Sequence, residues 1–389
     1  MFEWVIIGGG IHGCTIANYL IKSGKTTIDD LLIIDSHKEP MEKWKKLTSR
    51  IGMEYLRSPS VHHIDVNAFS LQNFRKLINH TEFYGQYKRP SLALFNEHCD
   101  SIITNVHLKD CWEQGRVIHV NKEEGKWKIE TDKGQSVLSN NLVISISVNE
   151  DLHIPKWVND LGEESASHIS HIFSEELTNL NDLTPPILVV GGGITAAHTV
   201  IKLCGLFPGK VTLLSRHRFR VHGFDSDPGW LGPKNMKFFS EIEDYKMRRE
   251  EITNARHKGS IPNDIYQKLI RLEKQGALRL VFDEVEAANK HNHEISINLK
   301  GGSGDFAFKH IILATGFESK LPEKGWLKQL IQKENLACAT CGYPIVNQGL
   351  EWCPHLYVSG PLAELEIGPT ARNISGARKA AERIVNYSE

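Results

Sequence analysis

Two glycine-rich stretches organise this chain: Ile6–Thr15 reads IIGGGIHGCT, and Val190–Thr199 reads VGGGITAAHT. Each follows a short apolar run, typical of a buried strand, and precedes a segment with apolar residues at helical spacing. A strand, a tight glycine turn and a helix together begin a βαβ unit. Because this order occurs twice, the sequence predicts two similar lobes in one chain.

The first stretch carries the pattern G-x-G-x-x-G at Gly8, Gly10 and Gly13. In such a turn the first glycine allows the tight bend, the second lets a pyrophosphate approach the backbone, and the third lets helix and strand pack closely. The next apolar run, LLIID, ends at Asp35, where a carboxylate is placed to bind ribose hydroxyls. We therefore expect a dinucleotide here, with an ordinary βα turn and a structural aspartate as the alternative.

The second stretch has the G-x-G-x-x-A variant at Gly191, Gly193 and Ala196, and the strand after it ends in Arg216 instead of an acid. A carboxylate at that position would repel a 2'-phosphate, whereas a guanidinium can bind one through two parallel hydrogen bonds. We expect this lobe to bind NADPH in preference to NADH. The alternative for Arg216 and the arginines that follow it is a solvated basic loop.

The predicted fold is α/β, with two Rossmann-like lobes that each carry a β-meander and with the second lobe inserted into the first. Alternating apolar and polar residues at 115–147 and again at 277–316 predict the two meanders. The polar segment before Ile187 predicts the linker between the lobes. We expect the first lobe to comprise residues 1–180 and 317–389, and the inserted lobe residues 185–316.

Composition favours an enzyme that acts on small molecules. The 46 basic and 47 acidic residues nearly cancel, so no overall field attracts nucleic acid or an acidic membrane. The opening MFEWVIIGGG leaves no room for a signal peptide, and no uncharged apolar run reaches about 18 residues, so a cytoplasmic protein without a membrane span is expected. The seven cysteines are scattered and odd in number, which indicates reduced thiols.

One C-x-x-C pattern occurs, at Cys338 and Cys341, with WCPH following at Trp352–His355. The second half of this set has a spacing that is uncommon for zinc ligands, so no metal site is predicted. A zinc site and a peripheral redox pair are the alternatives to simple packing of small apolar side chains.

The two turns, together with HIILATGFES at 310–319, resemble the flavoproteins that hold FAD on one Rossmann lobe and NAD(P)H on an inserted one. The resemblance covers nearly the whole chain. It implies that the lobe with Asp35 binds FAD and that Thr315 and Gly316 mark the return of the chain to that lobe. The branches of these flavoproteins that reduce disulfides carry a cysteine pair beside the flavin, and the matching segments of this chain lack one.

Three further stretches, residues 44–71, 224–252 and 357–384, resemble the N-hydroxylating flavin monooxygenases, the ornithine and lysine N-hydroxylases. The resemblance implies that Trp44, Arg57 and Ser58 lie at the flavin, with core packing or a surface loop as the alternative. It also implies that Gly368 precedes a helix start at Pro369 whose backbone N–H groups face the flavin ring. His62 and His63 are candidates for the flavin edge, against a hydrogen-bonded loop.

The resemblance implies a reaction as well. NADPH passes hydride to FAD, and a C4a-(hydro)peroxyflavin formed with dioxygen transfers oxygen to an amine or amino-acid nitrogen. The cofactor supplies this chemistry, so no catalytic side chain is predicted. Two alternatives stay open: a reductase that passes electrons to a carrier protein or quinone, and a flavin-binding sensor. Many proteins of this kind are homo-oligomers.

Overall fold

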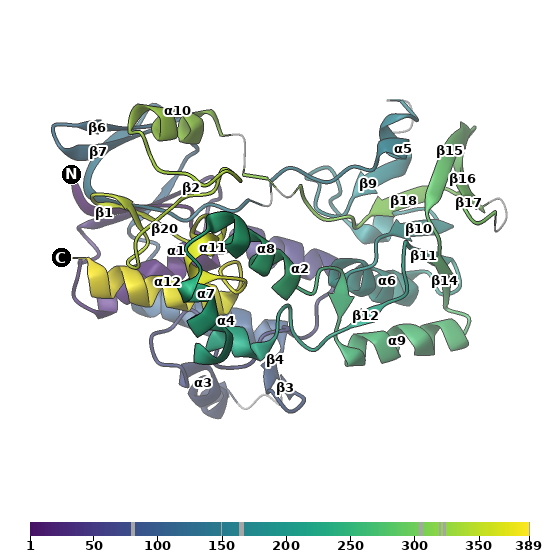
Figure 1. The fold of residues 1–389 in the computed structure, drawn as a ribbon. Helices are drawn as coiled ribbons and strands as arrows, with labels where there is room; N and C mark the ends of the chain where they lie inside the picture. Colours follow the sequence, from purple (N-terminus) through teal and green to yellow (C-terminus); the bar gives the residue numbers. More distant parts are fainter. Residues whose placement is uncertain are drawn as a thin grey trace.

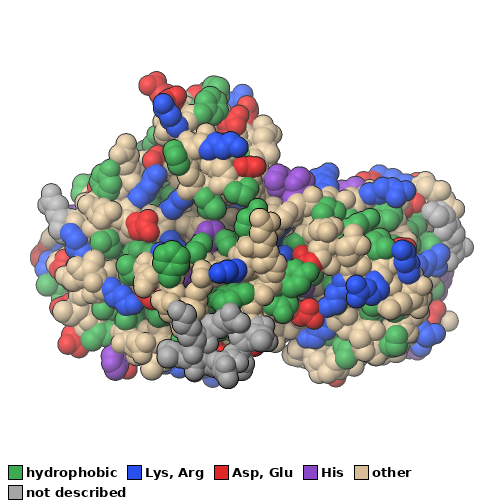
Figure 2. Space-filling view, turned by 90° about the horizontal axis from the view of Figure 1, so that it is seen from below, with side chains coloured by type: hydrophobic (Ala, Val, Ile, Leu, Met, Phe, Trp, Pro, Cys, Tyr) green, Lys and Arg blue, Asp and Glu red, His purple; other side chains and the backbone are tan. Residues whose placement is uncertain are grey.

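The computed structural model describes residues 1–78, 82–148, 150–162, 167–302, 306–318, 320–321 and 324–388. Two lobes, each built on a sheet of parallel strands with helices around it, lie side by side (Figure 1). Seen from below, the molecule is a larger and a smaller body that meet at a narrower waist (Figure 2). The described part of the chain contains no helix that is long and apolar enough to cross a membrane.

The first lobe is built on an eight-stranded sheet whose main path runs β19-β20-β8-β1-β2-β5. At its centre Val5 pairs with Leu32 on one side and Leu142 on the other, both in parallel register. A strand with parallel neighbours on both sides is covered on both faces, which explains its apolar sequence. The strands are β1 Phe2–Ile7, β2 Leu31–Asp35, β5 Trp112–Gln114, β6 Val117–Glu123, β7 Lys126–Thr131, β8 Ser136–Ile144, β19 Glu351–Cys353 and β20 Leu356–Val358.

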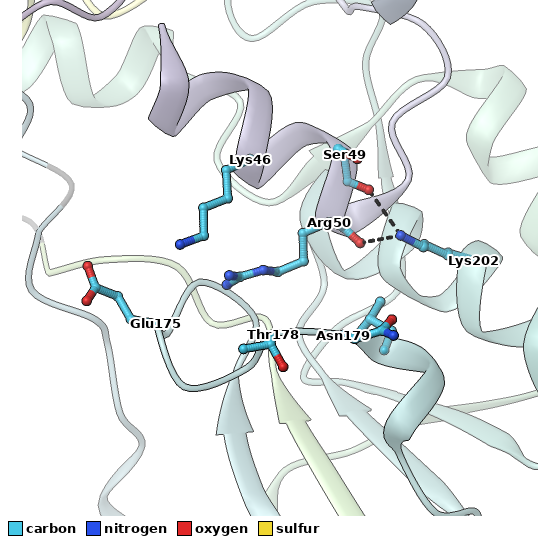
Figure 3. A pocket seen from close by; sticks show the side chains of 8 residues that line it. Lys46, Ser49, Arg50, Glu175, Thr178, Asn179 and Lys202 are labelled. Carbon is cyan, nitrogen blue, oxygen red and sulfur yellow. Dashed lines mark hydrogen bonds between the residues drawn. The ribbon is translucent and has the colours of Figure 1, made fainter. Parts of the chain in front are cut away.

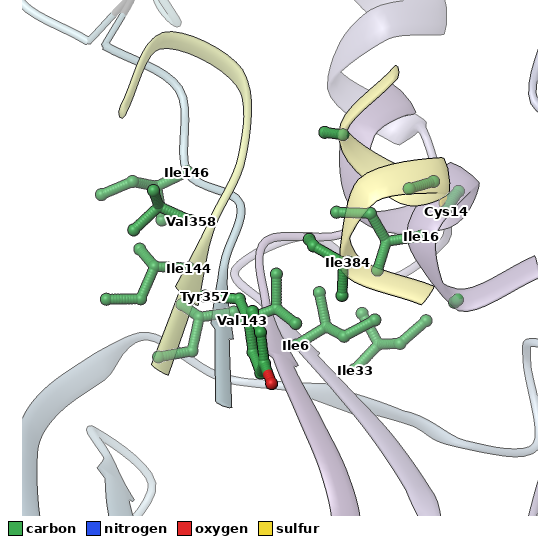
Figure 4. Packing of buried hydrophobic residues seen from close by; sticks show 14 of the residues in the cluster. Ile6, Cys14, Ile16, Ile33, Val143, Ile144, Ile146, Tyr357, Val358 and Ile384 are labelled. Carbon is green, nitrogen blue, oxygen red and sulfur yellow. The ribbon is translucent and has the colours of Figure 1, made fainter. Parts of the chain in front are cut away.

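The predicted first meander is confirmed, because β6, β7 and β8 pair in antiparallel order before β8 joins β1. Helices from both ends of the chain cover the sheet, and the first and last of them pack together. Ile16 and Ile384 meet there above Ile6 of the sheet (Figure 4). The helices of this lobe are α1 Ile11–Lys22, α2 Glu42–Ile51, α3 Ser70–Ile78, α4 Leu92–Asn105, α10 Gly325–Lys333, α11 Glu364–Ile367 and α12 Ile374–Tyr387, with a small hairpin of β3 Phe83–Tyr84 and β4 Arg89–Pro90.

The second lobe repeats the plan on a five-stranded parallel sheet of order β14-β11-β10-β18-β9. A separate antiparallel sheet, β15-β16-β17, follows β14 and leads into β18, as the second predicted meander requires. The strands are β9 Ile169–His171, β10 Ile187–Val190, β11 Val211–Ser215, β14 Leu278–Phe282, β15 Val285–His291, β16 Glu294–Leu299, β17 Phe306–Phe308 and β18 His310–Leu313; the helices are α5 Lys156–Asn159, α6 Ile194–Leu206 and α9 Asn263–Lys274.

The boundary between the lobes differs from the expected one at residues 180–185. Strand β9 pairs with β18, so Ile169–His171 already belongs to the second sheet. The two connecting chains also pair with each other, through a bridge between Leu152 and Phe317. The second sheet therefore begins just before the polar segment at 174–186, whose composition resembles a linker but whose Leu177, Leu180 and Leu183 are buried in the core of the second lobe.

A helical insert follows β11 of the second lobe and packs on the first lobe. Its side chains Trp230, Phe239 and Ile252 share an apolar cluster with Tyr343 and Leu365 of the first lobe. The insert therefore joins the two lobes independently of the paired connections. Its elements are β12 Arg220–Val221, η3 Pro228–Leu231, α7 Pro233–Glu241, α8 Tyr245–Ala255 and β13 Ser260–Ile261.

Candidate dinucleotide sites

The first glycine turn lies at the carboxyl end of β1, the central strand of its sheet. Gly8 has φ +103°, and a Cβ atom there would lie 2.6 Å from the carbonyl oxygen of Ser145. A Cβ on Gly13 would lie 1.9 Å from the carbonyl oxygen of Gly8. By contrast, a Cβ on Gly10, the N-cap of α1, would meet no described atom within 4 Å. The turn is therefore packed on the protein side and open at Gly10, in front of the first helical N–H groups, as a pyrophosphate requires.

Asp35 ends β2 beside this turn, and its carboxylate accepts the backbone N–H of Gly9 at 2.6 Å and that of His37 at 2.8 Å. The His37 ring also contacts the carboxylate, at 2.7 Å from Nδ1. Burial opposes ionisation of Asp35, but these hydrogen bonds outweigh burial and lower the pKa below its ordinary value. Asp35 is thus an ionised acceptor at the position where ribose hydroxyls would donate.

Two neighbours of the first turn were not found from the sequence. The ring of Trp112 in β5 covers Gly9 so closely that a Cβ there would lie 2.0 Å from it. His12, in the first turn of α1, has its Nδ1 2.9 Å from the Ser359 hydroxyl oxygen, and burial lowers its pKa to about 4. Both contacts join segments far apart in the sequence, so no local pattern signals them.

The second glycine turn, between β10 and α6, shows the same close packing of helix against strand. A Cβ on Gly191 would lie 2.5 Å from the carbonyl oxygen of Ala314. The Cβ of Ala196 would lie 3.1 Å from the same added atom, so the alanine of the variant pattern fills the space between helix and strand. Gly193 is the N-cap of α6, and Gly259 lies opposite it, with 3.4 Å between its Cα and a Cβ on Gly193. The loop at Gly259 therefore approaches the place of the phosphates.

Arg216 follows β11 directly and is exposed. Within the described ranges it forms no hydrogen bond or ion pair, although Glu284 is close enough for its acidity to respond to the Arg216 charge. The next arginine, Arg218, lies over the ring of Phe282 at 5.7 Å. Arg216 is thus exposed at the end of the strand that follows the second turn, and its contact with a 2'-phosphate stays a prediction.

Thr315 and Gly316 lie at the crossing between the lobes, where the resemblance places them. The Thr315 hydroxyl donates to the carbonyl oxygen of His153 at 2.5 Å, and the N–H of His153 donates to the carbonyl oxygen of Gly316 at 3.0 Å. Phe317 stacks on Phe173, with 5.2 Å between ring centres. These contacts fix the outgoing chain against the incoming one.

The structure corrects the role expected for Arg57. Its guanidinium donates to the carbonyl oxygens of His222, Gly223 and Phe224 at 2.8, 3.2 and 2.7 Å and to the Ser260 hydroxyl at 2.8 Å. These acceptors occupy the group, because they belong to the insert and use the N–H bonds that a flavin phosphate would need. Arg57 therefore connects the lobes. Its neighbour Ser58 is partly buried, and its role at the flavin stays a prediction.

Trp44 and His63 make contacts within the first lobe, and the placement of Trp44, His62 and His63 at the flavin stays a prediction. Trp44 donates from Nε1 to Asn96 Oδ1 at 3.0 Å and packs on Phe95 of α4. Nε2 of His63 lies 3.1 Å from the carbonyl oxygen of Ala68, and its Nδ1 accepts the N–H of Asp65. Burial lowers the pKa of His63 to about 3 and that of its neighbour His62 to about 4.

The segment around Gly368 is held by a buried carboxylate. Glu364 is 1% exposed and accepts hydrogen bonds from Arg372 and from Arg249 of α8. Burial opposes its ionisation, but the two guanidinium groups hold its pKa below the ordinary value. Gly368 itself has φ +85°, and α12 begins at Ile374. The proline at 369 therefore lies in a turn and not at the start of the helix as expected.

The C-x-x-C segment forms a tight turn, with the Gly342 N–H donating to the Ala339 carbonyl oxygen and a bridge between Cys338 and Pro344. Cys341 is exposed. In the part of the chain that the structure describes, no group of three or more His, Cys, Asp or Glu side chains is arranged to hold a metal ion.

Solved structures share this architecture along the whole chain. The ornithine hydroxylase PvdA of Pseudomonas aeruginosa has a TM-score of 0.74 at 16% identity, with 99% of this chain and 98% of that chain covered. The ornithine N-hydroxylase KtzI of Kutzneria sp. 744, solved with reduced FAD, NADP+ and L-ornithine, gives 0.76 at 15%, covering 99% and 98%. The cadaverine monooxygenase DfoA of Erwinia amylovora, solved with FAD, gives 0.75 at 13%, covering 99% and 94%. They confirm the predicted two-lobed α/β fold.

No curated protein matches the chain by sequence. The family model of L-lysine 6-monooxygenase/L-ornithine 5-monooxygenase matches residues 65–319, which is more than half of the chain. The match includes the second glycine turn, Arg216 and the insert. It confirms the predicted class, an oxidoreductase that uses FAD and NADPH as an N-hydroxylating monooxygenase. The chain belongs to the L-lysine 6-monooxygenase/L-ornithine 5-monooxygenase family.

Proposed function

We propose that this protein hydroxylates the terminal nitrogen of a small aliphatic amine, either a diamine or a basic amino acid, with dioxygen and NADPH as co-substrates. The observation that carries the proposal is the pair of glycine turns, each at the carboxyl edge of its own parallel sheet. Such edges bind nucleotides. Two of them in one chain allow one nucleotide to reduce the other.

The first lobe, with Gly8, Gly10, Gly13 and Asp35, is the proposed FAD lobe. The open side of Gly10 admits the pyrophosphate, and the ionised Asp35 accepts from the adenosine ribose. When bound, the flavin supplies the redox and oxygen chemistry. The chain positions it and limits its contact with water.

The second lobe is the proposed NADPH lobe, and the pairing of β9 with β18 supports including Ile169–His171 in it. Gly191, Gly193 and Ala196 form the turn for the pyrophosphate. Arg216 is the proposed partner of the 2'-phosphate, since its guanidinium is exposed beside the turn.

An amine substrate fits the family and the structural relatives, of which two act on ornithine and one on cadaverine by their names. An aliphatic amine has a pKa of about 10.4 and is mostly protonated at neutral pH. Because only the neutral nitrogen is a nucleophile, the site must hold the substrate in its deprotonated form.

The test supplies purified FAD-loaded protein with NADPH, 18O2 and separately L-ornithine, L-lysine or cadaverine. We expect one of these to yield a hydroxylamine that carries a single 18O atom, detected by mass spectrometry. NADPH oxidation that never yields a labelled product, but that a quinone or carrier protein accelerates, would instead establish the reductase alternative.

A further inference from the structure

A pocket of about 360 Å³ lies away from both glycine turns, where the first lobe meets the second. It lies between the last turn of α2, the segment 175–180 and the second half of α6, and no part of the proposed reaction uses it (Figure 3). Its volume is within the range of pockets that bind small ligands.

Positive charge dominates this pocket. Lys46, Arg50 and Lys202 line it, and Glu175 is the single acid in the lining. Lys46 and Arg50 are four residues apart on α2 and therefore project from the same face (Figure 3). Two like charges at this spacing repel each other, and one exposed carboxylate across the pocket does not neutralise three cations.

Several donors in the pocket have no protein acceptor among the described residues, and those of Lys46 and Thr178 are exposed to solvent. Arg50, which is 8% exposed, uses Nη1 to donate to the carbonyl oxygens of Ile172 and Ser174 at 3.0 and 2.7 Å. Its Nε and Nη2, and the Nζ of Lys46, form no hydrogen bond within the described ranges. The same is true there of the Thr178 hydroxyl.

The third cation has a different task. Lys202 of α6 donates to the carbonyl oxygens of Ser49 and Arg50 at 3.1 and 3.0 Å, which caps the end of α2 across the lobe boundary (Figure 3). Its stem packs on Gly52, where a Cβ would lie 3.0 Å from the lysine Cδ. This contact fixes the second lobe beside the pocket. Lys202 also adds a positive charge there, and the donors of Lys46, Arg50 and Thr178 stay free of it.

We propose that this pocket binds a phosphate group, with Arg50 and Lys46 as its cationic ligands and the Thr178 hydroxyl as a neutral donor. A phosphate carries about two negative charges at neutral pH and accepts hydrogen bonds through several oxygens. Three cations and one carboxylate give the pocket a net charge of about +2, which matches the phosphate, and its donors approach from both lobes. A guanidinium fork also suits phosphate geometry. The bound group would connect α2 to the segment 175–180.

The test uses FAD-loaded protein with saturating NADP+, so that the nucleotide sites are filled. Thermal unfolding is followed against sodium phosphate, against glycerol phosphate, and against sodium chloride of equal ionic strength. We expect a saturable rise in Tm with phosphate beyond that with chloride. A stronger response to glycerol phosphate identifies a phosphorylated metabolite as the source, and a stronger response to inorganic phosphate identifies the free ion.

Matched variants locate the effect. Lys46→Gln should weaken the apparent phosphate affinity by about tenfold, which corresponds to one charge-assisted contact. Lys45→Gln removes the same charge from the preceding residue, which pairs with Asp100 outside the pocket, and should leave the affinity unchanged. Thr178→Val should weaken it less than Lys46→Gln. Equal losses in Lys45→Gln and Lys46→Gln, no response beyond that to chloride, or an equal response to succinate would overturn the proposal.

Discussion

The carbonyl oxygen of Gly8 occupies the space that a side chain on Gly13 would need, 1.9 Å from the position of its Cβ. The end of β1 and the first turn of α1 therefore touch through their backbones. By contrast, a Cβ on Gly10, the glycine that faces the proposed pyrophosphate, would have no atom within 4 Å. The glycines of one motif thus have separate tasks, packing at Gly13 and ligand approach at Gly10.

These tasks predict different outcomes for two alanine variants. Gly13→Ala must push α1 away from β1 and should lower the stability of the apoprotein by about 1–3 kcal/mol, with loss of FAD. Gly10→Ala should leave the apoprotein nearly as stable as the wild type but weaken FAD binding. Denaturant unfolding of the apoproteins and flavin content after purification measure the two effects. Equal destabilisation by both substitutions would contradict this division.

Arg216→Ala tests the coenzyme preference. Loss of one hydrogen-bonded charge pair of about 1.5–3 kcal/mol should raise the KM for NADPH by about tenfold to hundredfold. NADH lacks the 2'-phosphate and serves as the internal control, so its KM should change little. Steady-state oxidation of both coenzymes by the same preparation gives the comparison. A similar rise for both would remove Arg216 from the site.

Arg57→Gln tests the connection between the lobes. The variant leaves the carbonyl oxygens of the insert without their donor and should lower stability by about 2 kcal/mol. Arg220→Gln is the control, since Arg220 is exposed and makes one hydrogen bond at 3.4 Å, and it should cost less than about 0.5 kcal/mol. If Arg57→Gln instead lost FAD at unchanged apoprotein stability, the guanidinium would belong to the cofactor site as first expected.

His198 predicts a dependence of stability on pH. This α6 side chain is 3% exposed, its Nε2 has no hydrogen-bond partner in the described structure, and burial lowers its pKa to about 4. Because its folded pKa lies below the unfolded value of 6.5, the unfolded chain binds the proton first as the pH falls. The protein therefore loses stability as the pH falls from about 6.5 to about 4.

The contribution of His198 between pH 8 and pH 5 amounts to about 2 kcal/mol. In His198→Leu this part of the pH dependence should disappear, so the variant gains stability over the wild type at pH 5 relative to pH 8. Urea unfolding at both pH values measures the difference. Parallel changes in wild type and variant would show that His198 is protonated in the folded protein.

The sequence predicted the parts of this protein that depend on neighbouring residues. The strand, turn and helix order at Gly8 and Gly191 and both meanders follow from local patterns, and the structure has them. The first strand of the second sheet was missed because β9 has only three residues, while the residues at 174–186 have a linker-like composition.

Contacts between distant segments account for the other differences. Arg57 was expected at the flavin, but its acceptors lie more than 160 positions away in the insert. Trp112 and Ser359 lie beside the first turn because the order of strands in the sheet brings their segments there, and no sequence motif marks them. Pro369 has the composition of a helix start, yet the buried pairing of Glu364 with Arg372 holds the chain in a turn there until Ile374.

The paired connections at His153 and Gly316 also bear on how the second lobe could have been acquired in evolution. The chain leaves the first lobe and comes back to it at adjacent points, with the His153 N–H 3.0 Å from the Gly316 carbonyl oxygen. A whole domain whose two ends are neighbours can be inserted in one recombination event without changing the strand order of the sheet that receives it. The contacts of α7 and α8 with the first lobe, and those of Arg57 and Lys202 across the boundary, could then evolve afterwards to join the two lobes.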